Sequence, residues 1–223
     1  MIFVTGGTGY LGRPLVEELV RLGHPVRVLV RRGSEGKAPA GAETVTGDPL
    51  DAASFAEDVR GCHTLIQLVG TPKPAPWKGA EFRAVDRESA YASVAAAQAA
   101  RVEHFVYLSV AHPAPVMKSY IEVRRDCEAL LRASGLRATV LRPWYVLGPG
   151  HWWPWALKPF YALGEAIPSM REGARRLGLV TRAEMIAALA WAVENPPDEW
   201  QVVDVPAILR GPYQSTTLPS SAS

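Results

Sequence analysis

The first twelve residues constrain the fold of this chain more than any other segment. The apolar run Ile2–Val4 favours a β-strand, and it is followed by Gly6, Gly9 and Gly12 and then by an amphipathic helical pattern over residues 15–22. A strand, a glycine-rich turn and a helix in this order place a dinucleotide pyrophosphate at the N-terminus of the helix. Gly6 permits a tight turn, Gly9 lets the backbone approach the phosphates, and Gly12 lets the helix pack close to the strand.

The alternative interpretation is an ordinary glycine turn between a strand and a helix. The position of the triplet, directly after a strand and before a helix, favours the nucleotide site. We expect the turn and the start of the helix to contact the cofactor through Gly6, Thr8, Gly9, Tyr10, Leu11 and Gly12.

The spacing of the glycines identifies a narrower group. Two residues separate each pair, whereas the most familiar dinucleotide fingerprint is Gly-x-Gly-x-x-Gly. The segment Thr-Gly-Gly-Thr-Gly-Tyr-Leu-Gly resembles the extended and atypical short-chain dehydrogenases/reductases, in the branch with NmrA-like and complex I accessory-subunit-like members. The resemblance covers about residues 1 to 205. It implies nucleotide binding and oxidoreductase chemistry.

Strand and helix patterns alternate along the chain, which predicts an α/β fold of Rossmann type with a doubly wound parallel sheet. After the first strand we expect strands at 26–30, 43–46, 64–69, 104–108, 138–141 and 200–205. We expect helices at 51–60, 81–101, 119–134 and 182–195.

A short substrate lobe interrupts this pattern mainly over residues 143–178, where tryptophan, tyrosine and phenylalanine are dense. These aromatic residues either form a small core of their own or line a pocket for an apolar or aromatic substrate. We expect one nucleotide-binding domain over residues 1–210 and a flexible polar tail over 211–223.

Composition excludes several classes of protein. The net charge of +2 does not suggest a nucleic-acid partner, and the two cysteines and five histidines show no metal-ligand spacing. We see no signal peptide and no transmembrane segment, so we expect a cytoplasmic monomer or homodimer that acts on a small molecule.

Arginine at the end of the second strand indicates the type of nicotinamide cofactor. In this fold an acidic residue at that position binds the ribose 2′-hydroxyl of NAD, whereas arginine accommodates the 2′-phosphate of NADP. Here the strand ends in Arg31 and Arg32, and the first carboxylate after the strand is that of Glu35. The pattern favours NADP(H), the alternative being two solvated surface arginines.

Further cofactor contacts follow from the resemblance and from the strand ends. The resemblance implies that Gly47 and Asp48 meet the adenine, although Asp48 is equally suited to a turn that caps the next helix. Val69 and Gly70 end the fourth predicted strand, where close approach to ribose and pyrophosphate is expected. The resemblance also implies that the backbone of Pro143 borders the nicotinamide.

Arg142, which precedes that proline, has a different expected partner. Its side chain is at least as well suited to pairing with a helix carboxylate such as Glu128.

The catalytic candidates are Tyr120, Arg124 and Ser109. Short-chain reductases use a tyrosine to donate a proton, a lysine four residues later to lower the pKa of the tyrosine, and an upstream serine to bind the substrate oxygen. The i, i+4 spacing puts the first two on one helix face. Here arginine stands in the lysine position, which keeps the charge but changes its geometry at the nicotinamide ribose.

Three functions remain open. The first is an NADP(H)-dependent oxidoreductase acting on a small carbonyl or apolar substrate. The second is an NADP(H)-binding sensor or assembly subunit without turnover, which the absent lysine allows. The third is a sugar-nucleotide epimerase or dehydratase, which the short lobe disfavours because a nucleotide sugar needs a larger binding surface.

Overall fold

A single parallel sheet forms the centre of the protein. The computed structural model describes residues 1–148 and 176–212, and within them seven strands pair in the order β3-β2-β1-β4-β5-β6-β9. β1 pairs in parallel with β2 on one side and with β4 on the other, so the order of the strands along the chain reverses between β1 and β4. The strands are β1 (Ile2–Thr5), β2 (Val26–Val30), β3 (Glu43–Thr46), β4 (Thr64–Gln67), β5 (His104–Leu108), β6 (Ala138–Arg142) and β9 (Trp200–Asp204).

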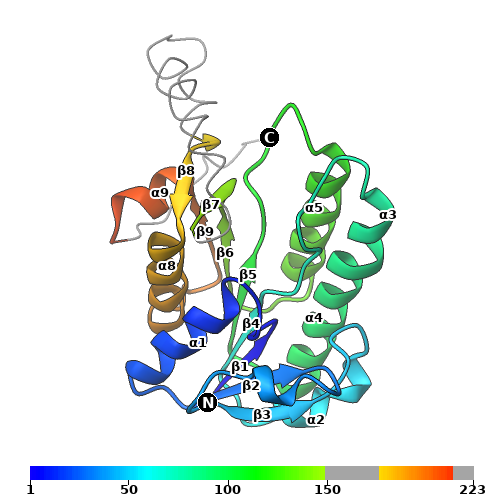
Figure 1. Cartoon of the computed structure of the whole chain (residues 1–223), viewed down its shortest axis with the longest axis vertical. Helices are drawn as coiled ribbons and strands as arrows, with labels where there is room; N and C mark the ends of the chain where they lie inside the picture. The colour runs from blue at the N-terminus through cyan, green and yellow to red at the C-terminus, as the bar shows by residue number, and fades with distance from the viewer. Residues whose placement is uncertain (149–175, 213–223) are drawn as a thin grey trace.

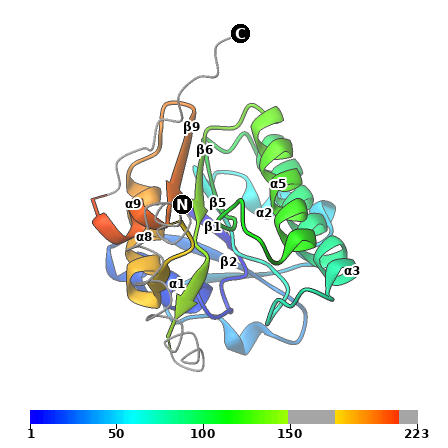
Figure 2. The same cartoon turned by 90° about the horizontal axis from the view of Figure 1, so that it is seen from above.

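Helices cover both faces of this sheet, which explains why the central strands are apolar on both sides. On one face lie α1 (Gly12–Arg21), α8 (Arg182–Glu194) and α9 (Val205–Arg210) (Figure 1). The other face carries α2 (Ala56–Val59), α4 (Glu88–Ala100) and α5 (Lys118–Ala133) (Figure 2). The α/β fold of Rossmann type that the sequence predicts is therefore confirmed, and ligands in this fold bind where the strand order reverses.

Two separate apolar cores result from this arrangement. The first core joins α1 to α8 through Leu15, Leu19 and Leu189, all fully buried. The second packs Phe105 of β5 and Leu131 of α5 together on the opposite face. The sheet separates the two cores, so the elements that carry the site are held from both sides.

Local signals in the sequence fix several boundaries. Thr181 caps α8 by accepting a hydrogen bond from the backbone N–H of Glu184, whose carboxylate accepts a bond from the Thr181 N–H, forming a capping box. Asp51 accepts a bond from the N–H of Ala53. Gly135 follows the end of α5 with a φ of +72°, as a helix C-terminal glycine should.

Two predicted helices are irregular. The segment 81–101 is divided into α3 (Gly79–Glu81), a π-helical turn η3 (Phe82–Arg87) and α4. The segment 51–60 contains a short 3₁₀ turn, η2 (Ala52–Ser54), before α2. The spacing of apolar residues along the sequence does not reveal a π-helical turn, because such a turn inserts one residue without changing the helical pattern on either side of it.

Some elements were not predicted, and some predictions lie outside the described residues. The elements missed are a second 3₁₀ turn, η1 (Glu35–Lys37), a parallel pair made of β7 (Tyr145–Leu147) and β8 (Leu179–Thr181), and α9. Most of the predicted lobe at 143–178 and most of the predicted tail at 211–223 fall outside the described residues. In the described parts of the chain, no helix is long and apolar enough to cross a membrane, and no group of three metal-ligating side chains occurs.

Candidate functional site

The turn between β1 and α1 is built by close backbone contacts. Gly6 has a φ of +75°, and a Cβ atom there would lie 2.9 Å from the backbone nitrogen of Val69 at the end of β4. A Cβ atom on Gly12 would lie only 2.1 Å from the carbonyl oxygen of Gly6. The steric roles predicted for Gly6 and Gly12 are confirmed, since neither position has room for a side chain.

Gly9 differs from Gly6 and Gly12 because it is exposed and only one atom lies close to its Cβ position. A Cβ atom there would meet only the Gly6 carbonyl oxygen, at 3.1 Å. No side chain of the described residues caps the N-terminus of α1, where Leu11 is the first flanking residue. An open glycine backbone beside an uncapped helix N-terminus fits a pyrophosphate, so the residues present fit a bound dinucleotide.

The other residues of the turn that we expected to contact the cofactor are Thr8, Tyr10 and Leu11, and each lies in a different environment. Thr8 is partly buried. Tyr10 lies beneath the guanidinium of Arg182, which is 5.5 Å from the ring centroid. Its hydroxyl approaches Gly148, where a Cβ atom would lie 2.2 Å from it. Leu11 packs against the apolar core beside α1.

The arginines after β2 are exposed and lie in a tight turn. The carbonyl oxygen of Arg31 accepts a hydrogen bond from the N–H of Ser34 at 2.9 Å, and the side chains of Arg31 and Arg32 are open to solvent. The carboxylate of Glu35 accepts a bond from the N–H of Gly33 at 3.0 Å. Backbone hydrogen bonds hold the pKa of Glu35 below its usual range, so this carboxylate stays ionised and engaged in its own turn.

The loop after β3 holds Gly47 and Asp48 against the short turn η2. A Cβ atom on Gly47 would lie 3.0 Å from both the Leu29 side chain and the Ser54 carbonyl oxygen. The carboxylate of Asp48 is exposed and accepts a bond from the N–H of Leu50 at 3.0 Å. The side chain thus stabilises a turn, as the alternative interpretation expected, and Asp51 is the residue that caps η2.

Gly70 has a structural reason to be glycine in addition to its predicted cofactor contact. A Cβ atom there would lie 2.7 Å from a terminal nitrogen of Arg124 and 3.0 Å from the carboxylate of Asp86. The glycine therefore makes room for a buried ion pair. Pro143 is buried at the end of β6, and its carbonyl oxygen accepts a bond from the N–H of Ala111 at 2.9 Å.

Arg124 lies at the centre of a buried polar network. Its Nη2 donates to Asp86 at 2.5 Å, and its Nη1 donates to the Leu108 carbonyl oxygen at 2.9 Å and to the Tyr107 hydroxyl at 3.2 Å. Asp86 also accepts from the backbone N–H and hydroxyl of Thr71 at 3.0 and 2.6 Å. A buried ion pair needs such additional hydrogen bonds to offset the loss of hydration.

The position of this network bears on the role expected for Arg124. Both terminal nitrogens of its guanidinium bind groups of the protein itself, deep beside β5. Burial alone would lower the pKa of Arg124, but Tyr107, Tyr120 and Asp86 raise it well above the usual value. Arg124 is therefore a permanent cation, and in this conformation its terminal nitrogens are already bound within the protein.

Tyr120 lies between this cation and a second ring. The Arg124 guanidinium is 5.0 Å from the centroid of the Tyr120 ring, and the ring of Phe82 is 4.8 Å away from it. Burial raises the pKa of Tyr120, and the Arg124 charge only partly opposes that rise. Arg124 lowers this pKa, as a cation four residues away should, but the loss of hydration of the phenolate outweighs that attraction and the net shift is upward.

Ser109 belongs to a different cluster, built around Glu128 of α5. Its hydroxyl donates to Glu128 Oε1 at 2.5 Å, while Arg142 binds both carboxylate oxygens, with its Nε at 3.1 Å from Oε1. The pairing of Arg142 with Glu128 is thus confirmed. Burial would raise the pKa of Glu128, but the nearby His112 ring, hydrogen bonds from Arg142 and Ser109, and the Arg142 charge hold it at about 2.

The structure therefore brings together two of the three predicted catalytic residues. Tyr120 and Arg124 are in contact, whereas the Ser109 hydroxyl donates its hydrogen bond to Glu128. Sequence reasoning missed Asp86, Thr71 and Tyr107. The sequence offered no distinct signal for Asp86, because Glu81 and Glu88 lie in the same predicted helix 81–101 and the partners of Asp86 lie far away in the sequence.

Comparisons with known proteins agree with this geometry. The profile of a family described as NAD(P)H-binding matches residues 6–148. A ceramide reductase of Caulobacter vibrioides is 32% identical over 152 residues, which are 67% of this chain and 47% of that protein. The photosystem II assembly factor Ycf39 of Trieres chinensis is 31% identical over 144 residues, 63% of this chain and 44% of its own. The chain spans about half the length of the curated relatives it matches.

Solved structures share the fold at lower identity. A short-chain dehydrogenase/reductase superfamily protein from Agrobacterium tumefaciens with bound NAD superposes with a TM-score of 0.68 at 21% identity, over 92% of this chain and 77% of that one. MoeE5 in complex with UDP-glucose and NAD gives a TM-score of 0.67 at 20% identity, over 93% and 79%. From its glycine turn, its sheet order and these matches, the chain belongs to the NAD(P)H-binding family of atypical short-chain dehydrogenases/reductases.

Proposed function

We propose that this protein is an NADP(H)-dependent reductase that acts on a small carbonyl or apolar compound, and that Tyr120 donates the proton. The observation that carries the proposal is the contact between a protonated Tyr120 and the permanent cation Arg124. Bound NADPH would supply the hydride to such a substrate. Its relatives named as reductases act on varied compounds, so the substrate itself is not proposed more narrowly.

The surroundings of Tyr120 favour reduction over oxidation. Since burial raises the pKa of Tyr120, its hydroxyl keeps its proton at neutral pH. Reduction of a carbonyl leaves an alkoxide that must be protonated, so a protonated phenol is in the right state to act. Arg124, 5.0 Å from the ring centroid, would stabilise the phenolate that remains after the transfer.

Arg31 and Arg32 support NADP(H) over NAD(H) in this proposal. Both side chains are exposed directly after β2, and the nearby carboxylate of Glu35 is bound to the N–H of Gly33. An arginine can bind the 2′-phosphate with a forked pair of charged hydrogen bonds, whereas no carboxylate of the Arg31–Glu35 turn is free to bind a 2′-hydroxyl.

Ser109 favours a second candidate function, which is NADP(H) binding without turnover. Its hydroxyl donates to Glu128, so in this conformation it cannot donate to a substrate oxygen. A substrate carbonyl would then be polarised by Tyr120 alone. Two of the relatives carry the name of an assembly factor rather than of a reductase. The likeness to MoeE5 is one of fold, and we do not propose sugar-nucleotide chemistry from it.

Fluorescence titration with NADPH and NADH tests the cofactor assignment. We expect selective NADPH binding, and we expect the Arg31→Ala/Arg32→Ala variant to lose at least about tenfold in NADPH affinity, since hydrogen bonds to charged groups contribute about 1.5–3 kcal/mol each. NADH affinity should hardly change. Equal losses for both cofactors would remove the assignment of a 2′-phosphate site.

Turnover tests the role of Tyr120. With NADPH and a panel of apolar ketones and aldehydes, Tyr120→Phe should abolish activity while NADPH affinity is retained. Activity that survives this substitution would exclude Tyr120 as the proton donor. NADPH binding without turnover of any compound in the panel by the wild-type protein would favour the second candidate.

A further inference from the structure

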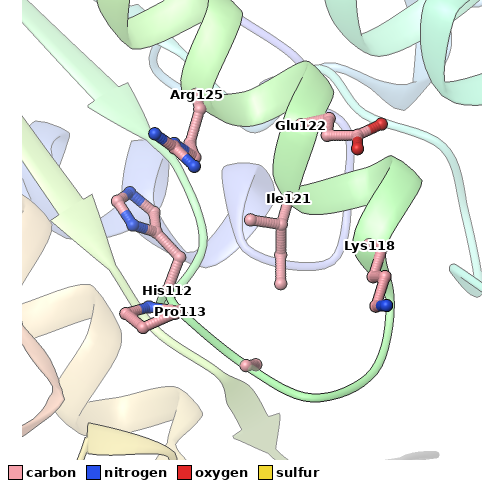
Figure 3. A pocket seen from close by; sticks show the side chains of 7 residues that line it. His112, Pro113, Lys118, Ile121, Glu122 and Arg125 are labelled. Atoms are coloured by element: carbon pink, nitrogen blue, oxygen red, sulfur yellow. The ribbon is translucent and has the colours of Figure 1, made fainter.

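A pocket lies between α5 and the loop that follows β5. Its volume is about 410 Å³, and it is lined by His112, Pro113, Ala114, Lys118, Ile121, Glu122 and Arg125. Figure 3 shows the side chain of Arg125 extending toward the ring of His112, while Ile121 points into the space between the helix and the loop. The pocket therefore has a polar end and an apolar wall.

Positive charge prevails at this pocket. Lys118 and Arg125 line it together with His112, against the single carboxylate of Glu122, which points away from Arg125 in Figure 3. Among residues 1–148 and 176–212, neither Lys118 nor Arg125 has an ion-pair partner. The guanidinium of Arg125 is therefore available to bind an anion.

Glu128 lies behind His112 but does not neutralise the pocket. It is 3.6 Å from the His112 ring nitrogen, and Arg142 binds both of its carboxylate oxygens. The Arg142 charge compensates the Glu128 charge, so Glu128 adds no net negative charge beside the pocket.

This pocket is separate from the Tyr120 site. Lys118, Ile121, Glu122 and Arg125 follow one another at helical spacing and so share one stripe of α5. Tyr120 and the buried Arg124 belong to the nearly opposite stripe, since each residue advances about 100° around a helix. The ligand of this pocket would therefore not need to be the reacting compound.

We propose that this pocket is a second ligand site, for a small organic carboxylate. The carboxylate group lies between Arg125 and His112, where the planar guanidinium matches its geometry, and Lys118 adds charge at the rim. The apolar body of the ligand packs on Ile121, Pro113 and Ala114. This inference does not depend on the proposed reductase activity.

Benzoate is a suitable probe, and benzamide is its uncharged isostere. In calorimetric titration of the full chain at pH 7, we expect benzoate to bind and benzamide to bind at least about tenfold more weakly, because a charge-assisted pair is lost. Arg125→Gln should weaken benzoate by a similar factor. Equal affinity for the two probes, or undiminished benzoate binding by Arg125→Gln, would overturn the proposal.

Matched controls separate this outcome from misfolding and from failure of the proposed function. Arg132→Gln changes an exposed arginine farther along the same helix, over the ring of Trp200, and should leave benzoate binding unchanged. Arg125→Gln should retain NADPH affinity, which shows that it is folded. Tyr120→Phe should bind benzoate normally, so a protein without reductase activity would still show this site.

Discussion

The glycine turn and the polar network of α5 solve opposite structural problems. In the turn, Gly6 and Gly12 pack so tightly that only backbone fits, while the backbone at Gly9 stays open. Around α5, charged groups are buried and bind one another, as in the pair of Arg124 with Asp86. The first region keeps its hydrogen-bonding capacity for a ligand, whereas the second uses most of that capacity to hold the fold. Four substitutions test this contrast, from the largest expected loss of stability to the smallest.

Removing the acidic partner of Arg124 should have the largest effect. Asp86→Ala leaves a fully buried cation without its carboxylate, which typically costs about 3–5 kcal/mol of unfolding free energy. Urea denaturation measures this loss. The double variant Asp86→Leu/Arg124→Met should recover much of it, because an apolar pair leaves no buried charge. Equal destabilisation in the single and double variants would contradict this reading of the network.

The second prediction concerns the pH dependence that Glu128 confers. Its pKa is about 2 in the folded protein, against about 4.3 in an unfolded chain. The carboxylate therefore stabilises the fold by about 3 kcal/mol above pH 5, and this contribution is lost as the pH falls from about 4.3 toward 2.

Glu128→Gln should flatten that part of the curve of stability against pH and lower stability at pH 7. Glu122→Gln, a change on the same helix at an exposed position, serves as the control and should leave the curve unaltered. A wild-type protein whose urea midpoint is the same at pH 7 and pH 3 would argue against the Glu128 cluster.

Gly12→Ala should destabilise the turn by steric overlap. The new methyl group would lie 2.1 Å from a backbone oxygen that has little freedom to move. Overpacking of this kind costs about 1–3 kcal/mol. Thermal denaturation and NADPH titration should both show a loss, because the turn and the start of α1 shift together. Retained NADPH affinity in this variant would mean that the turn is less rigid than its contacts indicate.

Gly9→Ala should have the smallest effect on stability and a clear effect on binding. Only the Gly6 carbonyl oxygen lies near the new methyl group, at 3.1 Å, so the loss of unfolding free energy should stay below about 1 kcal/mol. NADPH affinity should fall at least about tenfold, because the methyl group occupies space that the pyrophosphate needs. A variant that binds NADPH normally would place the cofactor elsewhere.

The sequence predicts the turn well and the network poorly, for physical reasons. The contact of Gly12 with the Gly6 carbonyl oxygen arises within seven residues, and a glycine records directly that a side chain does not fit, even where the neighbour is distant, as Val69 is for Gly6. The network joins Thr71, Asp86 and Arg124 from three separate elements. No local pattern states that these residues meet, and the π-helical turn that carries Asp86 leaves no periodic signature.

The identity and spacing of two residues also did not predict the direction in which the pKa of Tyr120 shifts. Arg124 was expected to lower the pKa of Tyr120 because a cation one helical turn away attracts the phenolate. The structure adds the burial of the ring, which acts in the opposite direction and prevails. Burial depends on Phe82 and on the packing of a distant helix, so it could not be weighed from the spacing of two residues.

The last strand of the sheet has a consequence for how this chain can be divided. β9 pairs along its whole length with β6, from Ala138 opposite Trp200 to Arg142 opposite Asp204. The family profile ends at residue 148 and therefore does not include β9. A fragment cut at this boundary would leave the edge of β6 unpaired and remove α8 from the apolar surface of α1. The segment that the family shares is thus shorter than the smallest piece expected to fold cooperatively, and expression of truncated versions should extend at least through α9.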